Sequence, residues 1–241
     1  MSEQWIVPEE RPALADGEAH VWLAHLPSAR ASFDQYARVL SGDEHARAEK
    51  FHFAEHRERW QMTRGILRLL LARYLEADAC EIAFDYGAQG KPRLRHPANP
   101  ALHFNASHAS DYAAFAMTRA DEVGVDIERI REEMPRRDEI ARRYFALGEQ
   151  QQLFALPEPE RARAFFALWT RKEAFVKARG DGIFSGLDQF EVALDPPRIL
   201  SVAGANSASR NWWMAALPPV PNYAGAVVVR AASCVVRFWK W

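Results

Sequence analysis

The chain has 241 residues, of which 49% are hydrophobic and 26% are charged, so it is long enough for one large domain or two small ones, each with its own core. Its 31 basic and 32 acidic side chains give a formal net charge of -1, which excludes the overall basic character of a general nucleic-acid binder and the charge excess of a disordered tail. Two cysteines, Cys80 and Cys234, are too few for a disulfide framework, and we expect them to be buried thiols.

The first residues lack the cationic and then apolar pattern of a secretory signal, and no apolar stretch is long enough to span a bilayer. We therefore expect a soluble, cytoplasmic protein that does not associate with membranes.

The first half of the chain alternates between strand and helix patterns. An irregular segment over residues 1–18 precedes a strand at 19–26, and Ser41 begins a helix with acidic residues in its first turn. Apolar spacing predicts a long helix over 57–77, whose polar side carries Arg57, Arg64, Arg68 and Arg73. That side is typical of a solvated face, and a wall facing phosphate groups is the alternative. Strands follow at 81–86, 102–107, 112–118 and 122–127, with a turn at 87–92 and a loop at 97–100.

The second half repeats this order. A charged segment at 131–137 resembles a linker, and helices are predicted at 138–145, 149–155 and 160–178. Strands follow at 189–194, 198–203, 212–217, 223–230 and 234–239. No repeat is visible at the level of residues. The order nevertheless predicts an α+β fold of two similar halves, residues 1–118 and 119–241, with any site in the cleft between them.

Three segments carry polar residues in patterns that suit chemistry. Asp126 and Glu128 are two residues apart on a predicted strand and so share a face, where a hard cation such as Mg²⁺ would relieve their repulsion. Glu173 and Lys177 are four residues apart on the longest predicted helix of the second half. Taken singly, the first pair is more typical of a solvated strand face than of a metal site, and an ordinary surface pair is the alternative for the second.

The third segment, FNASH at 104–108, places a hydroxyl and an imidazole at a strand end, which suits phosphate oxygens. A capped turn with a satisfied histidine is the alternative. A separate string, His52 to His56, spells H-x-x-E-H, the inverted zinc-protease motif, but it lacks an obvious third ligand.

Together these segments resemble one family, the Sfp-type 4′-phosphopantetheinyl transferases. The resemblance rests on the sequences GKP at 90–92, FNASH at 104–108, GVDIE at 124–128 and WTRKEAFVKARGDG at 169–182, in that order, and covers about residues 40–195. A weaker match around Arg47, Lys50 and Phe51 accounts for the H-x-x-E-H string without zinc. The family often has a serine after the histidine of FNxSH, where this chain has Ala109.

The resemblance implies two α/β halves related by a pseudo-twofold axis, with coenzyme A between them. It implies transfer of the 4′-phosphopantetheine group of coenzyme A to a serine of an apo acyl or peptidyl carrier protein, with release of 3′,5′-ADP. Asp126, Glu128 and Glu173 would bind Mg²⁺, or alternatively Mn²⁺, which stabilises charge on the leaving phosphate. The residues implied in coenzyme A binding are Arg47, Gln89, Gly90, Lys91, Pro92, Asn105, Ser107, His108 and Lys177.

The catalytic residues implied by the resemblance are Glu149, Glu173 and Lys177, with Glu149 as the base that deprotonates the serine. A catalytically idle coenzyme A or carrier-protein binding module on the same fold is the alternative function. We expect a monomer, because two halves that form their own cleft need no second subunit. The expected partners are carrier domains of peptide, polyketide or fatty-acid synthases, and the associated role is in secondary metabolite biosynthesis.

Overall fold

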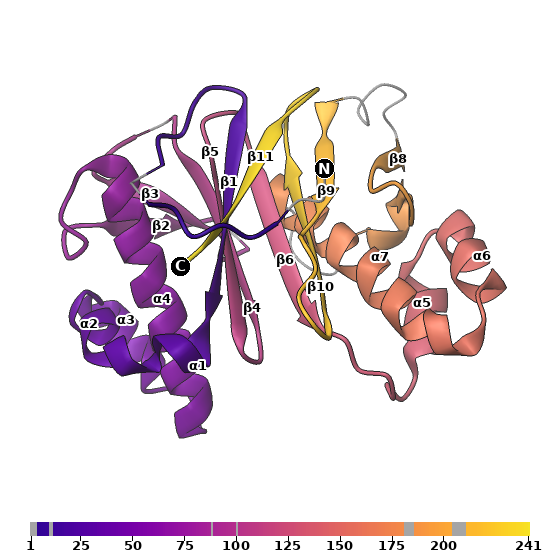
Figure 1. The fold of residues 1–241 in the computed structure, drawn as a ribbon, viewed down its shortest axis with the longest axis horizontal. Coiled ribbons are helices and arrows are strands. Elements are labelled where there is room, and N and C mark those ends of the chain that lie inside the picture. The colour runs from indigo at the N-terminus through magenta and orange to yellow at the C-terminus, as the bar shows by residue number, and fades with distance from the viewer. Residues whose placement is uncertain (1–3, 10–11, 88, 100, 181–185, 204–210) are drawn as a thin grey trace.

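A computed structural model describes residues 4–9, 12–87, 89–99, 101–180, 186–203 and 211–241. Residues 181 and 182, which end the WTRKEAFVKARGDG motif, therefore lie outside the described residues. The protein has two halves side by side, each with a long helix on the outer side of a sheet (Figure 1). No helix in the described ranges is both long and apolar enough to cross a membrane.

The N-terminal half begins with a strand and a set of short helices. Its elements are β1 (Glu18–His25), α1 (Leu26–Ala29), a 3₁₀ turn (Arg30–Ser32), α2 (Phe33–Arg38), α3 (Gly42–Ala48), α4 (Ala54–Leu75), β2 (Ala83–Tyr86), β3 (Pro92–His96), β4 (His103–Ala109) and β5 (Tyr112–Thr118). The short helices between residues 26 and 38 and the strand at 92–96 were not predicted, because each is too short to show a periodic pattern. Of the two cysteines, Cys80 is exposed and Cys234 is partly buried, so the expectation of buried thiols is wrong.

The C-terminal half has the same order of elements. These are β6 (Val123–Arg129), α5 (Arg137–Tyr144), α6 (Leu147–Ala155), α7 (Glu158–Arg179), a 3₁₀ turn (Leu187–Gln189), β7 (Phe190–Val192), β8 (Ile199–Val202), β9 (Trp213–Ala216), β10 (Tyr223–Val229) and β11 (Val235–Lys240). The two long helices, α4 and α7, each have 22 residues, and both their first and their last residues are 104 positions apart.

The sheets give the same correspondence. The strands of the first sheet lie in the order β11-β1-β5-β4 and those of the second in the order β6-β10-β9, so β1, β5 and β4 correspond to β6, β10 and β9. This repeat agrees with the predicted α+β fold of two similar halves. The last strand departs from it, because β11 runs parallel to β1 and pairs Glu18 with Val235. Residues 235–240 thus belong to the sheet of the N-terminal half, and the predicted division at 118/119 does not separate the halves completely.

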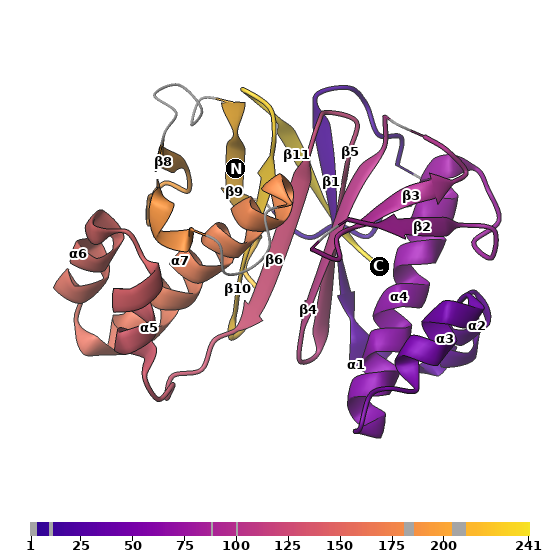
Figure 2. The same cartoon turned by 180° about the vertical axis from the view of Figure 1, so that it is seen from behind.

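Three apolar clusters hold these layers together. α4 packs on one face of the first sheet through residues such as Ile66 and Leu70, against Trp22 and Phe115. α7 packs on the second sheet in the same way. The inner faces of the two sheets meet in a third cluster made mostly of alanine and valine, including Val21 and Val125. β6 lies between α7 and the first sheet (Figure 2). Because successive strand residues face opposite sides, Val125 points to the other sheet while Asp126 points to α7.

Candidate active site between the two halves

A glycine on β6 allows α7 to approach the sheet closely. A Cβ atom at Gly124 would collide with the carbonyl oxygen of Ala174 and the amide nitrogen of Ala178. Alanine at both helix positions keeps the helix surface small at this contact. The close approach brings the polar side of the last turns of α7, with Glu173 and Lys177, to the strand residues Asp126 and Glu128.

Three predicted residues from three elements form one hydrogen-bonded triangle. Ser107 on β4 donates from Oγ to Oδ1 of Asp126 at 2.8 Å. The ammonium group of Lys177 on α7 donates to the same Oδ1 at 2.7 Å and to Oγ of Ser107 at 2.9 Å. Lys177 is 22% exposed and Asp126 only 5%. The triangle joins β4 of the N-terminal half to β6 and α7 of the C-terminal half.

The three predicted metal ligands form an acidic cluster beside this triangle. Burial raises the pKa of Glu173 to about 7, and the charge of Asp126 adds to the rise. Burial and then Asp126 likewise raise the pKa of Glu128 to about 7. Two buried oxygens, Oδ2 of Asp126 and Oε1 of Glu173, have no hydrogen-bond partner among the residues that the structure describes. Buried carboxylates that repel one another and keep free oxygens fit the binding of a hard cation.

The cluster is open rather than a finished metal cage. Among the residues that the structure describes, no group of three or more His, Cys, Asp or Glu side chains is arranged to hold a metal ion. A cation at Asp126, Glu128 and Glu173 would therefore keep water molecules in its coordination shell, as Mg²⁺ commonly does.

A groove leads from this cluster across the N-terminal half. One part of it is lined by Arg47, Trp60, Thr63, Arg64, Leu67, Tyr86, Gly90, Pro92, Asn105, Ala106 and His108. The adjoining part is lined by Gln89, Gly90, Lys91, Pro92, Asn105, Ala106, Val176, Lys177 and Gly180. The groove thus brings together the residues implied in coenzyme A binding, except Ser107, which lies at its end beside Lys177.

Two of these residues have roles that their contacts define further. Oδ1 of Asn105 accepts a hydrogen bond from the backbone amide of Val125 at 3.0 Å, so its side chain ties β4 to β6. His108 lies on β4 and keeps part of its surface in contact with solvent. Neighbouring groups displace water from its ring, which lowers the pKa of the imidazole, and the positive charges of Lys177 and Arg59 lower it further. A neutral imidazole at pH 7 can accept or donate a hydrogen bond at the groove.

By the resemblance, the side chain of Lys91 is expected to contact the 3′-phosphate of coenzyme A, but its ammonium group has other partners. Its ammonium group donates to Oε2 of Glu122 at 2.6 Å and to the backbone carbonyls of Val123 and Ala178. Its backbone lines the groove, but its charge is directed into the C-terminal half. The expectation that Lys91 contacts a phosphate group is not supported by this arrangement.

Glu149 lies apart from the acidic cluster. Its carboxylate is fully buried and accepts hydrogen bonds at 2.7 Å from Nζ of Lys172 to both oxygens. The backbone amides of Ala146 and Val192 donate to it as well, at 2.7 and 2.8 Å. A carboxylate that accepts four hydrogen bonds from three donor groups and has no exposed surface cannot receive a proton from a bound substrate. The prediction that Glu149 is the general base is therefore wrong for this arrangement, and its role is structural.

Glu149 has a counterpart in the N-terminal half. Glu44 caps α3 by accepting a hydrogen bond from the amide of Ser41 at 2.9 Å, and both Arg64 and Arg68 of α4 bind its carboxylate. Arg68 and Lys172 are 104 residues apart, which is the spacing of the two long helices. Arg68 is 1% exposed. The basic residues of the predicted helix at 57–77 therefore include Arg68, which is buried against Glu44 rather than solvated or facing the groove.

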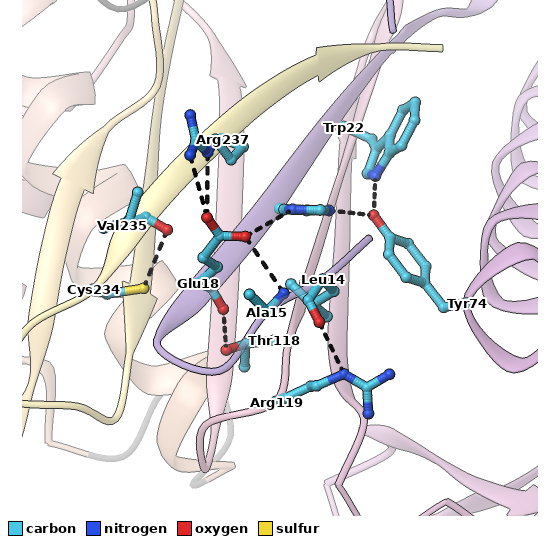
Figure 3. Close-up of polar contacts among 11 residues, drawn as sticks. Leu14, Ala15, Glu18, Trp22, Tyr74, Thr118, Arg119, Cys234, Val235 and Arg237 are labelled. Carbon is cyan, nitrogen blue, oxygen red and sulfur yellow. Dashed lines mark hydrogen bonds and ion pairs between the residues drawn. The ribbon is translucent and has the colours of Figure 1, made fainter. Parts of the chain in front are cut away.

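The positions that correspond to the acidic cluster carry other side chains in the N-terminal half. Trp22 and Leu69 lie 104 residues before Asp126 and Glu173, and both belong to or pack on an apolar cluster. Nε1 of Trp22 donates to Oη of Tyr74 at 2.8 Å, in a network that continues to Glu18 and Arg237 (Figure 3). The acidic cluster is thus formed by residues of the C-terminal half, and the N-terminal half contributes Ser107 and most of the groove.

The H-x-x-E-H string does not form a zinc site. His52 and His56 both make edge-to-face contacts with the ring of Phe53, at 5.2 and 5.5 Å between ring centroids. Glu55 forms an ion pair with Arg59 at 2.9 Å. All five residues of the string are described, and none of them belongs to a metal-binding group.

Some residues of the groove were not predicted as site residues. Trp60 and Tyr86 line it, and Glu122 holds Lys91. Tyr86 directly precedes the predicted turn at 87–92, and Glu122 lies two residues before GVDIE. Their proximity to these motifs is the sequence feature that could have identified them.

Comparisons with known proteins agree with this geometry. The family model described as 4′-phosphopantetheinyl transferase, N-terminal, matches residues 26–120, and the model of the 4′-phosphopantetheinyl transferase superfamily matches residues 122–228. The chain is 35% identical to the 4′-phosphopantetheinyl transferase HetI of Nostoc sp. over 246 residues, which cover 100% of both chains. It is 28% identical to the 4′-phosphopantetheinyl transferase Sfp of Bacillus subtilis over 183 residues, or 76% of this chain and 79% of that one.

Among solved structures, the crystal structure of Thermotoga maritima holo-[acyl-carrier-protein] synthase has a TM-score of 0.35 and 20% identity, and covers 46% of this chain and 62% of that one. The matches along the whole chain determine its identity: the protein is an enzyme of the 4′-phosphopantetheinyl transferase superfamily.

Proposed function

We propose that the enzyme transfers the 4′-phosphopantetheine group of coenzyme A to a serine hydroxyl of an apo acyl or peptidyl carrier protein and releases 3′,5′-ADP. The observation that carries the proposal is the triangle of Ser107, Asp126 and Lys177 beside an acidic cluster with unpartnered buried oxygens. This combination offers a phosphate group donors on one side and cation ligands on the other.

Asp126, Glu128 and Glu173 are the proposed ligands of Mg²⁺, and Mn²⁺ is a possible substitute. Bound there, a divalent cation supplies electrostatic stabilisation of the charge that develops on the pyrophosphate as the bond to the leaving phosphate breaks. The pKa values of Glu128 and Glu173 near 7 support this assignment, because a nearby cation would favour the charged forms of both carboxylates.

The other residues of the groove bind and orient coenzyme A. Lys177 and Ser107 would donate to phosphate oxygens, since both already donate to an anionic acceptor in the triangle. Arg47 and His108, at the other end of the groove, are the proposed partners of the 3′-phosphate. The backbone at Gln89 to Pro92 forms the wall proposed for the adenine.

The base that accepts the serine proton is proposed to be a carboxylate of the acidic cluster rather than Glu149. Oε1 of Glu173 is the better placed atom, because it is buried near Asp126 and makes no hydrogen bond in the described structure.

The proposed partners are carrier domains of peptide, polyketide or fatty-acid synthases, in secondary metabolite biosynthesis, and the proposed state is a cytoplasmic monomer. The groove supports the monomer, because one chain supplies both of its walls.

The test is incubation of the enzyme with coenzyme A, Mg²⁺ and a panel of apo carrier proteins, followed by intact mass measurement. We expect a gain of one phosphopantetheine group on at least one carrier, loss of the gain with a chelator, and its return with Mg²⁺ or Mn²⁺. A carrier whose acceptor serine is replaced by alanine is the control. If no carrier in the panel gains mass while the enzyme binds coenzyme A, the idle binding module is the correct alternative.

A further inference from the structure

Lys91 lies where the two halves meet, and the partners of its charged end in the described part of the chain belong to the C-terminal half. Its three contacts are Oε2 of Glu122 at 2.6 Å, the carbonyl of Ala178 at 3.1 Å and the carbonyl of Val123 at 3.3 Å. An ammonium group has three hydrogens, so these acceptors account for all of them. The side chains of Lys91 and Glu122 are only 13% and 21% exposed, which distinguishes this ion pair from a loose surface pair.

The contact joins the two walls of the groove. Lys91 belongs to the turn between β2 and β3, whose backbone forms one wall, and the carbonyl of Lys91 accepts a hydrogen bond from Gly87 that closes the turn. The opposite wall is the end of α7 at Val176, Lys177 and Gly180. The carbonyl of Ala178 is in the last turn of that helix, where carbonyls lack helical partners and a cation is favoured.

From this geometry we propose that Lys91 is a positioning residue for coenzyme A and does not bind its phosphate groups. Its ion pair with Glu122 and its bond to the end of α7 set the distance between the turn at residues 87–92 and Lys177. The inference rests on the proposed function, which assigns coenzyme A to this groove. It predicts that Glu122, which carries the wrong charge to bind a phosphate group, assists coenzyme A binding as much as Lys91 does.

The first test measures coenzyme A binding by calorimetry for the full-length variants Lys91→Met, Glu122→Gln and the double variant. We expect each single variant to weaken binding by about tenfold and the double variant to weaken it no further, because both remove the same contact. If Lys91 bound a phosphate group instead, Glu122→Gln would free its ammonium group, and the affinity for coenzyme A would be unchanged or higher. That result would overturn the inference.

The second test uses 3′-dephospho-coenzyme A as a probe of the phosphate contact. A positioning residue affects the binding of both compounds, so Lys91→Met should weaken both by the same factor and keep their ratio of dissociation constants. If the dissociation constants of the two compounds became nearly equal in Lys91→Met, Lys91 would contact the 3′-phosphate directly, and this result would contradict the proposal. Arg47→Met is the comparison, because Arg47 is a proposed partner of the 3′-phosphate. In this variant the dissociation constants of the two compounds should become nearly equal.

Arg93→Met is the matched control. Arg93 also reaches Glu122, at 3.5 Å, but it is 68% exposed and, among the described residues, forms no hydrogen bond or ion pair with α7. We expect this variant to bind coenzyme A as the wild type does, and a tenfold loss would show that any cation beside Glu122 matters, against the positioning role of Lys91. Melting temperatures confirm that each variant is folded. If the wild type itself fails to bind coenzyme A, the proposed function and this inference both fail. If the wild type binds coenzyme A but Lys91→Met binds it no better than 3′-dephospho-coenzyme A, the inference alone is overturned.

Discussion

The two halves share one framework, but they use its central positions differently. On β6 and α7 the residues that face each other are Asp126 and Glu173, whereas the corresponding residues on β1 and α4 are Trp22 and Leu69. The contact beside them differs too: Gly124 meets Ala174 and Ala178, whereas His20 bonds Tyr74 at 2.7 Å. The shared framework is therefore stabilised by apolar and aromatic contacts. The acidic cluster is present in one half, where the repulsion between its carboxylates destabilises the fold.

The halves agree, by contrast, in how the short helices are attached. In each, a buried glutamate at the start of a short helix binds a buried cation on the long helix. Arg68 also donates to the carbonyls of Ala79 and Ile82, and Lys172 to that of Phe190, so the same cation holds the segment after the long helix. This shared ion pair belongs to the framework rather than to the chemistry.

The largest expected effect separates the cluster from the framework. Glu173→Gln should lower the transfer rate by about a thousandfold, because it removes a proposed cation ligand and charge stabilisation of that kind supplies several kcal/mol. The same variant should raise the melting temperature at pH 8, since it removes a buried charge that Asp126 and Glu128 repel. Rates are measured by mass gain of the carrier. Leu69→Met, at the corresponding position of the other half, is the control and should leave the rate unchanged. Full activity of Glu173→Gln would show that the acidic cluster is not the site.

The next effect tests the shared ion pair. Lys172→Met leaves the buried carboxylate of Glu149 without a cation and should lower the free energy of unfolding by about 3–5 kcal/mol. Arg68→Met should cost less, because Arg64 still binds Glu44. Urea denaturation of both variants measures the difference. In the double variant Lys172→Met/Glu149→Leu, most of the loss should be recovered, and failure to recover it would mean that Lys172 acts through packing rather than charge.

The smallest effect concerns pH and the framework of the N-terminal half. Burial lowers the pKa of His20 to about 4, while Glu18 opposes and Arg237 assists the shift. Between pH 6.5 and 4, His20 is therefore protonated in the unfolded chain but not in the folded protein. The stability contributed by the neutral imidazole is present above pH 6.5 and is lost as the pH falls toward 4. The loss amounts to about 3 kcal/mol.

His20→Gln should remove this part of the acid sensitivity, measured by urea denaturation between pH 7 and 4. His45→Gln, at an exposed histidine on α3, is the matched control and should retain the wild-type dependence. An unchanged pH dependence in His20→Gln would show that the network of Figure 3 does not sense acid.

Local patterns were sufficient to predict much of the fold and the composition of the site. Apolar periodicity predicted both long helices, and the strand spacing of Asp126 and Glu128 correctly predicted a shared face, as the effect of Asp126 on the pKa of Glu128 shows. The motif order predicted that Ser107 and Lys177 belong to one site, and they are 2.9 Å apart. These predictions succeeded because each depends on residues within one element or on a motif whose members occur together.

What could not be predicted depends on contacts between distant segments. Nothing near Glu149 in the sequence indicates that Lys172 binds it, and the same is true of Lys91 and Ala178, which are 87 residues apart. A carboxylate or ammonium group has the same appearance in a sequence whether it faces a substrate or a buried partner. The burial of Arg68 was missed for that reason, since its position on a polar helix side gave no sign of Glu44.

The pairing of β11 with β1 has a consequence for how the molecule forms. Glu18 and Val235 are neighbours in the sheet but stand 217 positions apart along the chain, so the edge of the first sheet can be completed only after the second half has been synthesised. Closing so long a loop is slow compared with forming local contacts. During that interval β1 has an unpaired edge, which is a surface prone to aggregation. A break between β5 and β6 would make this exposure permanent, so the two similar halves cannot be treated as independent folding units.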